Sequence, residues 1–242
     1  MQISESSFRK RKDPPVSYLD NFETDLLPTT AGDLRLTFLG HGSLLLTFNS
    51  KHIYIDPFGK VADYSRLPKA DLILITHEHG DHLDLQALAS LRTDQTQIVL
   101  TEACAGQVKG GIVMHNHGAR TVQNISIESA PAYNVRNKRP DGQPFHPKGI
   151  GNGYILTFGD LRFYIAGDTE NIPEMKELKD ISVAFLPMNL PYTMTPEMAA
   201  DAAKSFHPKI LYPYHFGDTD TSRLIALLKG DPSIEVRIRR MA

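Results

Sequence analysis

One short segment constrains this chain more than any other. Residues 76–82 read Thr-His-Glu-His-Gly-Asp-His, which places three imidazoles and the Asp81 carboxylate within six positions. The segment directly follows the apolar run Leu72–Ile75, which predicts a buried strand. Two histidines that are two residues apart in extended backbone point to the same side, so His77 and His79 can bind one metal ion.

The second half of the segment predicts a second cation. Gly80 permits a sharp turn that brings Asp81 and His82 to a neighbouring position. A carboxylate oxygen and an imidazole nitrogen there suit a second zinc-like ion. The alternative is a polar loop with solvated histidines, and the regular spacing argues against it. We therefore predict that this loop supplies half of a dinuclear metal centre.

The motif and its surroundings resemble the metallo-β-lactamase superfamily. Four further segments carry the resemblance, in the family's order: Leu39–Ser43, Ile55–Pro57, Ala166–Thr169 and Pro213–His215. The resemblance covers about residues 34–240. It is strongest to a branch of metal-dependent hydrolases that is distantly similar to ascorbate-phosphate lactonases and N-acyl-phosphatidylethanolamine phospholipase D. It implies an α/β fold, a four-layer αββα sandwich of two mixed sheets.

The pattern of expected elements agrees with that fold. Apolar and alternating runs predict strands near residues 34–39, 43–48, 53–56, 72–76, 98–101, 120–130, 153–158, 161–166, 181–186, 210–213 and 234–238. Capping residues and apolar stripes predict helices near residues 84–90, 172–178, 195–206 and 221–229.

A short internal echo supports two similar halves. Leu46–Phe48, followed by Tyr54 and Ile55, recurs as Leu156–Phe158, followed by Tyr164 and Ile165. Each copy predicts a β-hairpin with a two-residue turn. The echo is weak evidence alone, because two unrelated hairpins would look the same.

Composition indicates one enzyme-sized domain. We expect a hydrolase domain over residues 33–242. Residues 1–32 are expected to form an N-terminal extended arm that packs on the domain or on a partner, or else a solvated tail.

The charge of the chain does not indicate nucleic-acid binding. Its formal net charge is −2, although Phe8–Lys12 is locally basic. No segment of the sequence predicts a membrane span. The single cysteine, Cys104, fits a reducing cytoplasm and a buried position.

The resemblance implies two distant metal ligands. Asp168 stands where the family has a carboxylate that bridges both metals, and His215 stands where the last histidine completes the second metal's shell with Asp81 and His82. The alternatives are an aspartate that caps a turn and a surface histidine.

The chain departs from the family at the third ligand of the first metal. Many relatives carry a histidine where this chain reads Pro131–Asn134. We expect His146, on a Gly- and Pro-rich loop, to be a ligand or a substrate-contacting residue instead. His115 and His117 are weaker competitors within a predicted turn. For His41, a role in supporting the site and a structural turn are equally plausible.

A dinuclear centre predicts hydrolysis of an ester, lactone, amide or phosphodiester bond by a metal-activated water. Asp81 would orient the nucleophile, and Tyr133, His146 or a water would protonate the leaving group. Two zinc ions are the first choice, with manganese or iron as alternatives. The substrate is expected to be a small molecule. Four basic residues of the 131–153 loop would suit an anionic one, although a solvated loop is the favoured alternative: Arg136, Lys138, Arg139 and Lys148. The alternative functions are a nuclease or phosphodiesterase and a non-enzymatic, metal-stabilised binding protein.

Overall fold

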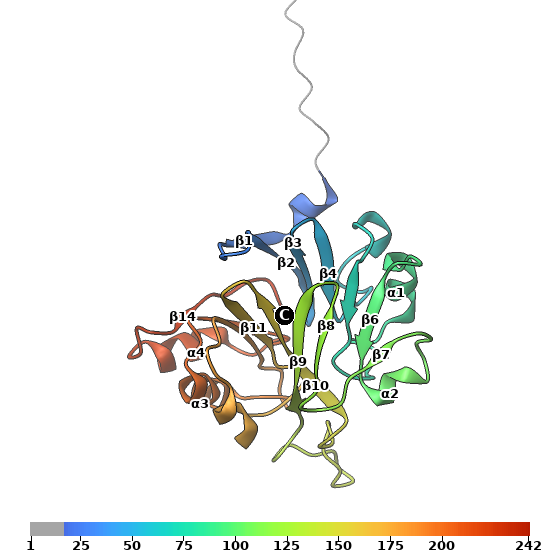
Figure 1. Ribbon diagram of the computed structural model, residues 1–242. Coiled ribbons are helices and arrows are strands. Elements are labelled where there is room, and N and C mark those ends of the chain that lie inside the picture. Colours follow the sequence, from blue (N-terminus) through green and yellow to red (C-terminus); the bar gives the residue numbers. More distant parts are fainter. Residues whose placement is uncertain (1–16) are drawn as a thin grey trace, which may run out of the picture.

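Two seven-stranded mixed sheets lie face to face in the computed structural model, which describes residues 17–242 (Figure 1). The first sheet follows chain order: β1 (Glu23–Leu27), β2 (Leu34–Gly40), β3 (Ser43–Phe48), β4 (Lys51–Ile55), β5 (Leu72–Leu74), β6 (Gln97–Leu100) and β7 (Ile112–Val113). So does the second: β8 (Ala119–Val122), β9 (Ile125–Ala132), β10 (Gly151–Phe158), β11 (Leu161–Ile165), β12 (Val183–Pro187), β13 (Ile210–Tyr214) and β14 (Glu235–Val236).

Helices cover the outer face of each sheet. Those of the first half are η1 (Tyr18–Asn21), η2 (Tyr64–Arg66), α1 (Leu85–Leu91) and α2 (Glu102–Ala105), and those of the second are η3 (Pro173–Glu177), α3 (Pro196–Phe206) and α4 (Thr221–Leu228). This arrangement confirms the predicted four-layer αββα sandwich.

Among residues 17–242, no helix is both long and apolar enough to cross a membrane.

The buried run at β5 shows how the layers are held together. Leu72 and Leu74 point into the core between the sheets, whereas Ile73 and Ile75 belong to the core beneath α1. All four side chains are fully buried. A strand that is covered on both faces needs a continuous apolar sequence rather than an alternating one, which explains the run before His77.

The two sheets repeat one plan. Each begins with four antiparallel strands, β1–β4 or β8–β11, and continues with parallel ones. Both copies of the sequence echo are hairpins, β3–β4 and β10–β11. Asn49 and Ser50 turn the first with positive φ angles of 47° and 62°.

Several expected elements differ from the structure. The predicted strand 120–130 is a hairpin of β8 and β9, because Gln123 and Asn124 adopt positive φ angles of 53° and 64°. The predicted helix 172–178 is the shorter 3₁₀ helix η3, and β14 spans two residues. The short elements η1, η2, α2, β1 and β7 were not predicted.

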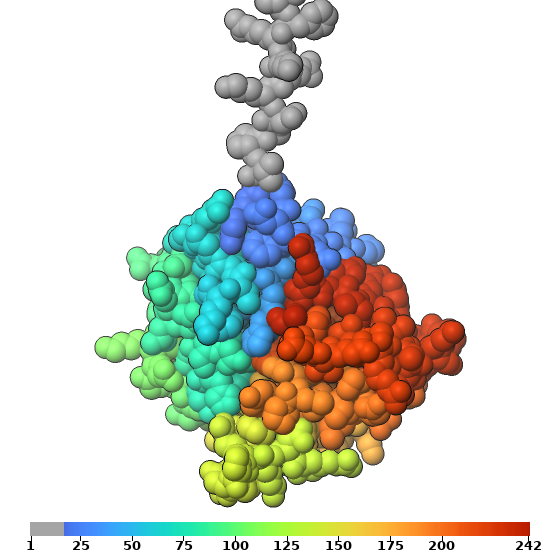
Figure 2. All heavy atoms as spheres, turned by 180° about the vertical axis from the view of Figure 1, so that it is seen from behind, coloured from blue at the N-terminus to red at the C-terminus, as the bar shows by residue number. Residues whose placement is uncertain are grey.

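Part of the expected N-terminal arm belongs to the first sheet. Glu23–Leu27 forms the edge strand β1, which pairs with β2. Asp25 on this strand accepts two hydrogen bonds from Arg239 Nη2, at 2.7 and 2.8 Å, and another from the Tyr212 hydroxyl. The C-terminal segment thus lies against β1, as Figure 2 shows in red and blue. The basic run Phe8–Lys12 lies outside the described residues, and the domain division at residue 33 stays a prediction.

We expect Asp25→Asn to lower the free energy of unfolding by about 1–2 kcal/mol at pH 7, because it removes a charged and largely buried hydrogen-bond acceptor. Burial would raise the pKa of Asp25, but the bonds from Tyr212 and Arg239 outweigh it and lower the pKa. A lowered carboxyl pKa stabilises the fold above the unfolded-state value of about 3.9, and this stability is lost as the pH falls below it.

Urea unfolding at pH 7 and pH 3 measures this effect. The difference between wild type and variant should shrink at pH 3, and the exposed Asp94→Asn should change nothing. An equal difference at both pH values would contradict the ionic role of Asp25.

Candidate metal centre

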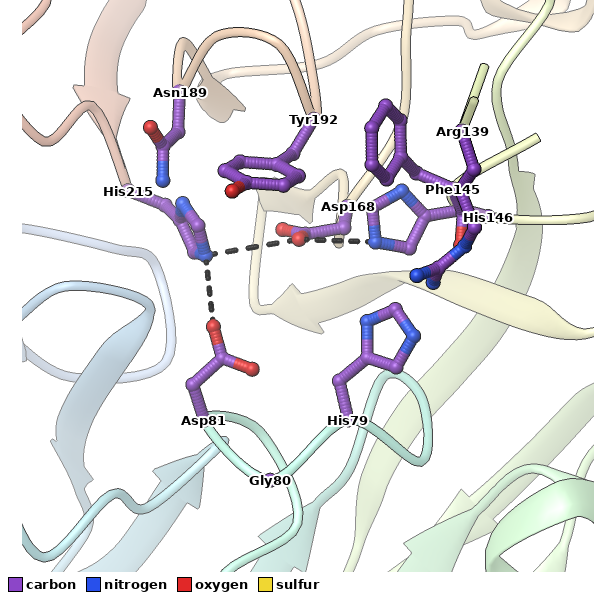
Figure 3. Close-up of a pocket in the computed structure, with 10 residues that line it drawn as sticks. All are labelled: His79, Gly80, Asp81, Arg139, Phe145, His146, Asp168, Asn189, Tyr192 and His215. Atoms are coloured by element: carbon purple, nitrogen blue, oxygen red, sulfur yellow. Dashed lines mark hydrogen bonds and ion pairs between the residues drawn. The ribbon is translucent and has the colours of Figure 1, made fainter. Parts of the chain in front are cut away.

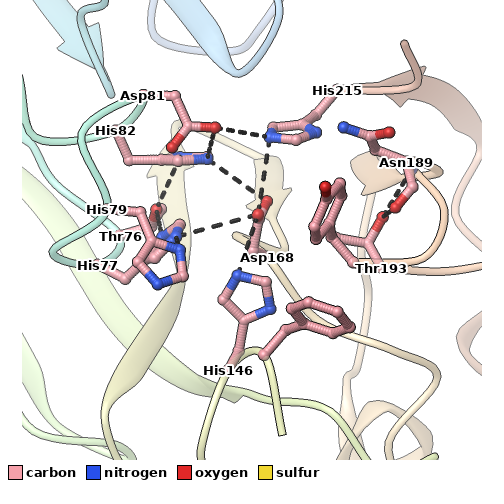
Figure 4. Close-up of polar contacts among 12 residues, drawn as sticks. Thr76, His77, His79, Asp81, His82, His146, Asp168, Asn189, Thr193 and His215 are labelled. Atoms are coloured by element: carbon pink, nitrogen blue, oxygen red, sulfur yellow. Dashed lines mark hydrogen bonds and ion pairs between the residues drawn. The ribbon is translucent and has the colours of Figure 1, made fainter. Parts of the chain in front are cut away.

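The predicted ligands come together where strands from both sheets end (Figure 4). The loop after β5 carries His77, His79, Asp81 and His82, and the chain reaches Asp168 after β11 and His215 after β13. Carboxyl ends of parallel strands meet at one edge of a sheet, so residues far apart in sequence become neighbours.

Two glycines near these ligands behave differently. Gly167, before Asp168, has a φ of +67°, and an added Cβ would lie 2.8 Å from the Asn152 carbonyl oxygen, so glycine is required there. Gly80 does not have a positive φ, and an added Cβ would meet nothing within 4 Å. The turn is instead held by hydrogen bonds from the backbone amides of His82 and Leu83 to the His79 carbonyl, at 2.9 and 2.7 Å. The expected turn at Gly80 is therefore present, although its geometry does not require glycine.

The first group of donor atoms consists of His77, His79 and His146. Their ligand atoms lie within 4.8 Å of one another, and His77 Nε2 is 3.1 Å from His79 Nδ1. The 133–150 loop therefore brings His146 beside His77 and His79. His115 and His117 do not belong to any of the groups of donor atoms found within residues 17–242.

The second group consists of Asp81, His82 and His215, together with His41. Asp168 lies between the two groups. Its Oδ2 is 3.3 Å from His146 Nε2 and 3.6 Å from His215 Nε2, and its Oδ1 is 3.5 Å from His82 Nε2. One carboxylate therefore faces donors of both groups.

Hydrogen bonds on the far side of three rings determine which nitrogen each histidine offers. His82 Nδ1 donates to Asp56 Oδ2 at 2.8 Å, and His146 Nδ1 donates to Asn134 Oδ1 at 2.8 Å. The hydroxyl of Thr76 donates to Asp56 and can therefore accept from His77 Nδ1 at 3.0 Å. In each ring Nε2 is left to face the cluster.

Orphaned atoms show that the residues fit a metal. Within residues 17–242, the buried atoms His82 Nε2 and Asp168 Oδ1 have no hydrogen-bond partner. Leaving such atoms unsatisfied costs about 1–3 kcal/mol each, more when charged. A cation between them would satisfy both, and imidazole nitrogens with carboxylate oxygens are the donors that zinc, manganese and iron accept.

Burial and mutual charge prepare these groups for a cation. Burial lowers the pKa of His77 and His79, so both rings are neutral near pH 7. Burial would raise the pKa of Asp168, but the histidines around it, His215 first, hold it well below its usual value. Burial also opposes the charge on His82, yet Asp168 and Asp56 raise its pKa to about 10. The two aspartates thus attract positive charge to this point.

His41, whose role was open, supports the cluster. Its Nε2 donates to Asp81 Oδ2 at 3.0 Å, and its carbonyl accepts from the His215 amide at 3.0 Å. The residue also makes a turn, with a φ of 53°. It therefore combines both roles that the sequence suggested.

A pocket of about 460 Å³ opens over the cluster (Figure 3). It is lined by His79, Gly80, Asp81, Arg139, Phe145, His146, Asp168, Asn189, Tyr192 and His215. Asn189 and Tyr192 were missed by the sequence analysis, because they lie on an irregular loop without a recognisable motif.

Tyr133 was predicted as a proton donor, and the structure contradicts this. Its hydroxyl donates to Glu174 at 2.9 Å and accepts from Lys148 Nζ at 3.2 Å. Its ring packs in the core beneath α3 and does not line the pocket.

Comparisons with known proteins agree with this geometry. A family profile described as the β-lactamase superfamily domain matches residues 35–215. A metal-dependent hydrolase of the UPF0173 group from Pelotomaculum thermopropionicum is 30% identical, over 85% of this chain and 96% of its own length. A second, from Thermococcus kodakarensis, is 32% identical, over 76% of this chain and 84% of its own length.

Solved structures show the same fold. A crystal structure of a Parabacteroides distasonis protein, assigned as a metal-dependent hydrolase, is 50% identical with a TM-score of 0.87, and covers 91% of this chain and 100% of that one. A metallo hydrolase from Ignicoccus hospitalis has a TM-score of 0.69 at 24% identity, over 86% of this chain and 96% of that one. The chain therefore belongs to the metallo-β-lactamase superfamily, and within it to the metal-dependent hydrolases that these relatives represent.

Proposed function

We propose that this chain hydrolyses an ester, lactone, amide or phosphodiester bond of a small molecule, with two divalent metal ions. The observation that carries the proposal is the position of Asp168, whose carboxylate contacts donors of both groups and borders the open pocket. Zinc is the first choice because nitrogen donors dominate, with manganese and iron as alternatives. The single cysteine, buried Cys104, supports a cytoplasmic setting.

Each ion would have its own set of ligands. His77, His79 and His146 would hold the first, while Asp81, His82 and His215 would hold the second. Asp168 would contribute an oxygen to both and fix their separation. His146 is better placed as a ligand than as an acid, because Asn134 engages its Nδ1 and its Nε2 faces Asp168.

When bound, two such ions lower the pKa of a water between them and polarise a carbonyl or phosphoryl oxygen. Asp81 is held through its Oδ2 by His41, which leaves Oδ1 to accept a hydrogen bond from the attacking water. Asn189 and Tyr192 border the pocket beside His215 and can orient the substrate (Figure 3). Tyr192 also takes the place of Tyr133 as the phenol available to protonate a leaving group.

The pocket distinguishes this proposal from its rivals. A metal-stabilised scaffold would have a coordinatively closed site, whereas here Asp81, Asp168 and His146 all border open space. A nuclease would need a basic track for a polymer backbone, which a net charge of −2 does not favour. A small substrate fits a pocket of about 460 Å³.

Activity on three generic substrates tests the reaction class. Zinc-loaded protein should hydrolyse at least one of p-nitrophenyl acetate, a homoserine lactone and bis(p-nitrophenyl) phosphate, and Asp168→Ala should abolish that turnover. Protein that retains two ions but leaves all three substrates intact would contradict hydrolysis of ester, lactone and phosphodiester bonds and would favour the scaffold.

We expect His146→Ala to reduce the zinc content from two ions per chain towards one, because the first ion would retain only His77 and His79. Elemental analysis after gel filtration measures this directly. The exposed His115→Ala is the matched control and should keep both ions. An unchanged zinc content in His146→Ala would remove His146 from the ligand set.

Asn134 provides a finer test of the same ligand. Asn134→Leu removes the acceptor that orients His146, so we expect the affinity of the first ion to fall about 10–100-fold, as is typical for partners of ligating histidines. Asn134→Asp retains the acceptor and should restore most of the affinity. Zinc titration against a chelator gives the constants. Equal affinity in both variants would show that Asn134 does not position the ring.

A further inference from the structure

We propose that the pocket selects an anionic substrate with an apolar group beside the anion, and that Arg139 is the residue that pairs with the anion. This inference rests on the proposed function, because it concerns the substrate of the same site. It goes further by naming the chemistry of that substrate and a residue that recognises it.

Arg139 has no counter-ion in the part of the chain that the structure describes. Within residues 17–242, no carboxylate lies within ion-pair distance of its guanidinium, whose only side-chain hydrogen bond is to the Phe145 carbonyl at 3.3 Å. Its neighbours differ, since Lys148 pairs with Glu174 at 2.8 Å and Arg136 borders a separate hollow beside Lys176. Arg139 alone of these cations lines the pocket over the metal ligands.

The backbone around Arg139 forms a hydrogen-bonded turn, although its residues are exposed. Its amide donates to the Gln143 carbonyl at 2.7 Å, and its carbonyl accepts from Gly142 at 2.9 Å. Lys138 and Pro144 form a β-bridge on either side of this turn. The guanidinium is therefore presented from a fixed base, which reduces the entropy lost when it binds an anion.

A buried carboxylate anchors the start of the same loop. Glu170 is 1% exposed and accepts hydrogen bonds from the amides of Val135, Arg136 and Asn137 at 2.8, 2.6 and 2.7 Å. Because Glu170 follows Asp168 by two residues, the strand end that carries the central carboxylate also holds the loop that carries Arg139. The backbone at the start of this loop is thus tied to the segment that carries Asp168.

Aromatic rings provide the apolar wall. The guanidinium carbon of Arg139 lies 5.2 Å from the centre of the Phe145 ring, and Phe145 meets Tyr192 edge to face at 5.0 Å. Both rings line the pocket, and Figure 3 shows them with Asp168 between Tyr192 and His146. In a substrate whose scissile bond lies at Asp168, an adjoining apolar group would contact the two aromatic rings, and an anionic group beyond it would contact Arg139.

Charge also favours an anion once metal is bound. Two divalent cations outweigh the carboxylates of Asp81 and Asp168, and Arg139 adds to this positive field without neutralisation. A guanidinium can bind a carboxylate or a phosphate through two parallel hydrogen bonds, so either group has the required chemistry.

Calorimetric titration of zinc-loaded protein with phenylphosphonate tests the proposal. Arg139→Gln should weaken binding about 10–100-fold, which corresponds to about 1.4–2.8 kcal/mol. Dimethyl phenylphosphonate, the uncharged counterpart, should bind equally to wild type and variant. Methylphosphonate, which lacks the ring, should bind wild type more weakly than phenylphosphonate. Phenylacetate in place of phenylphosphonate shows whether a carboxylate or a phosphorus oxyanion is preferred.

Arg136→Gln is the matched control, because it removes an equal charge from the same loop outside this pocket, and it should change affinity less than twofold. Equal binding of phenylphosphonate to wild type and Arg139→Gln would overturn the proposal, and so would the absence of binding to wild type. Zinc content, measured on the same samples, decides the metal centre separately. An Arg139 proposal that fails while two ions are retained therefore leaves the hydrolase proposal intact.

Discussion

A fully buried carboxylate, Asp56, holds the metal centre in position. Its side chain accepts from the Thr76 amide at 2.8 Å, the Thr76 hydroxyl at 2.6 Å and His82 Nδ1 at 2.8 Å. The Asp56 amide donates a hydrogen bond to the Leu74 carbonyl, and the Asp56 carbonyl accepts one from the Ser43 hydroxyl. Such a carboxylate is tolerable at 0% exposure because it accepts three hydrogen bonds inside the protein. The start of the ligand loop, its last histidine and the ends of three strands all depend on this one group.

Backbone strain gathers around the same point. His41, Asp56 and His215 have φ angles of 53°, 43° and 46°, a region that costs a residue with a side chain about 1 kcal/mol or more. All three belong to the cluster or bind it directly. The cores on both sides of each sheet hold them there, because the strands that lead into these turns are buried. The local cost is therefore met by packing elsewhere in the domain.

The sequence revealed features with strong periodicity or dense chemistry. The apolar runs predicted most of the long strands, and the spacing of His77, His79, Asp81 and His82 predicted a cluster that the structure shows gathered in one place. Contacts made by irregular loops left no such trace. Asn134, Glu170 and Tyr192 matter through three-dimensional placement, which no local pattern encodes. Tyr133 was misassigned because its nearness in sequence to the vacant ligand position says nothing about the direction of its side chain.

Because the two sheets repeat one plan, Asp56 and Asp168 occupy matching positions in the two halves. Asp56 follows β4 and Asp168 follows β11, which are matching strands of the two halves. His82 lies between them, with Nδ1 at 2.8 Å from Asp56 and Nε2 at 3.5 Å from Asp168. One imidazole thus lies between carboxylates that occupy matching positions in the two halves. Any sliding of one sheet over the other would change the separation of these two carboxylates, so the geometry of the ligand set depends on the alignment of the two halves.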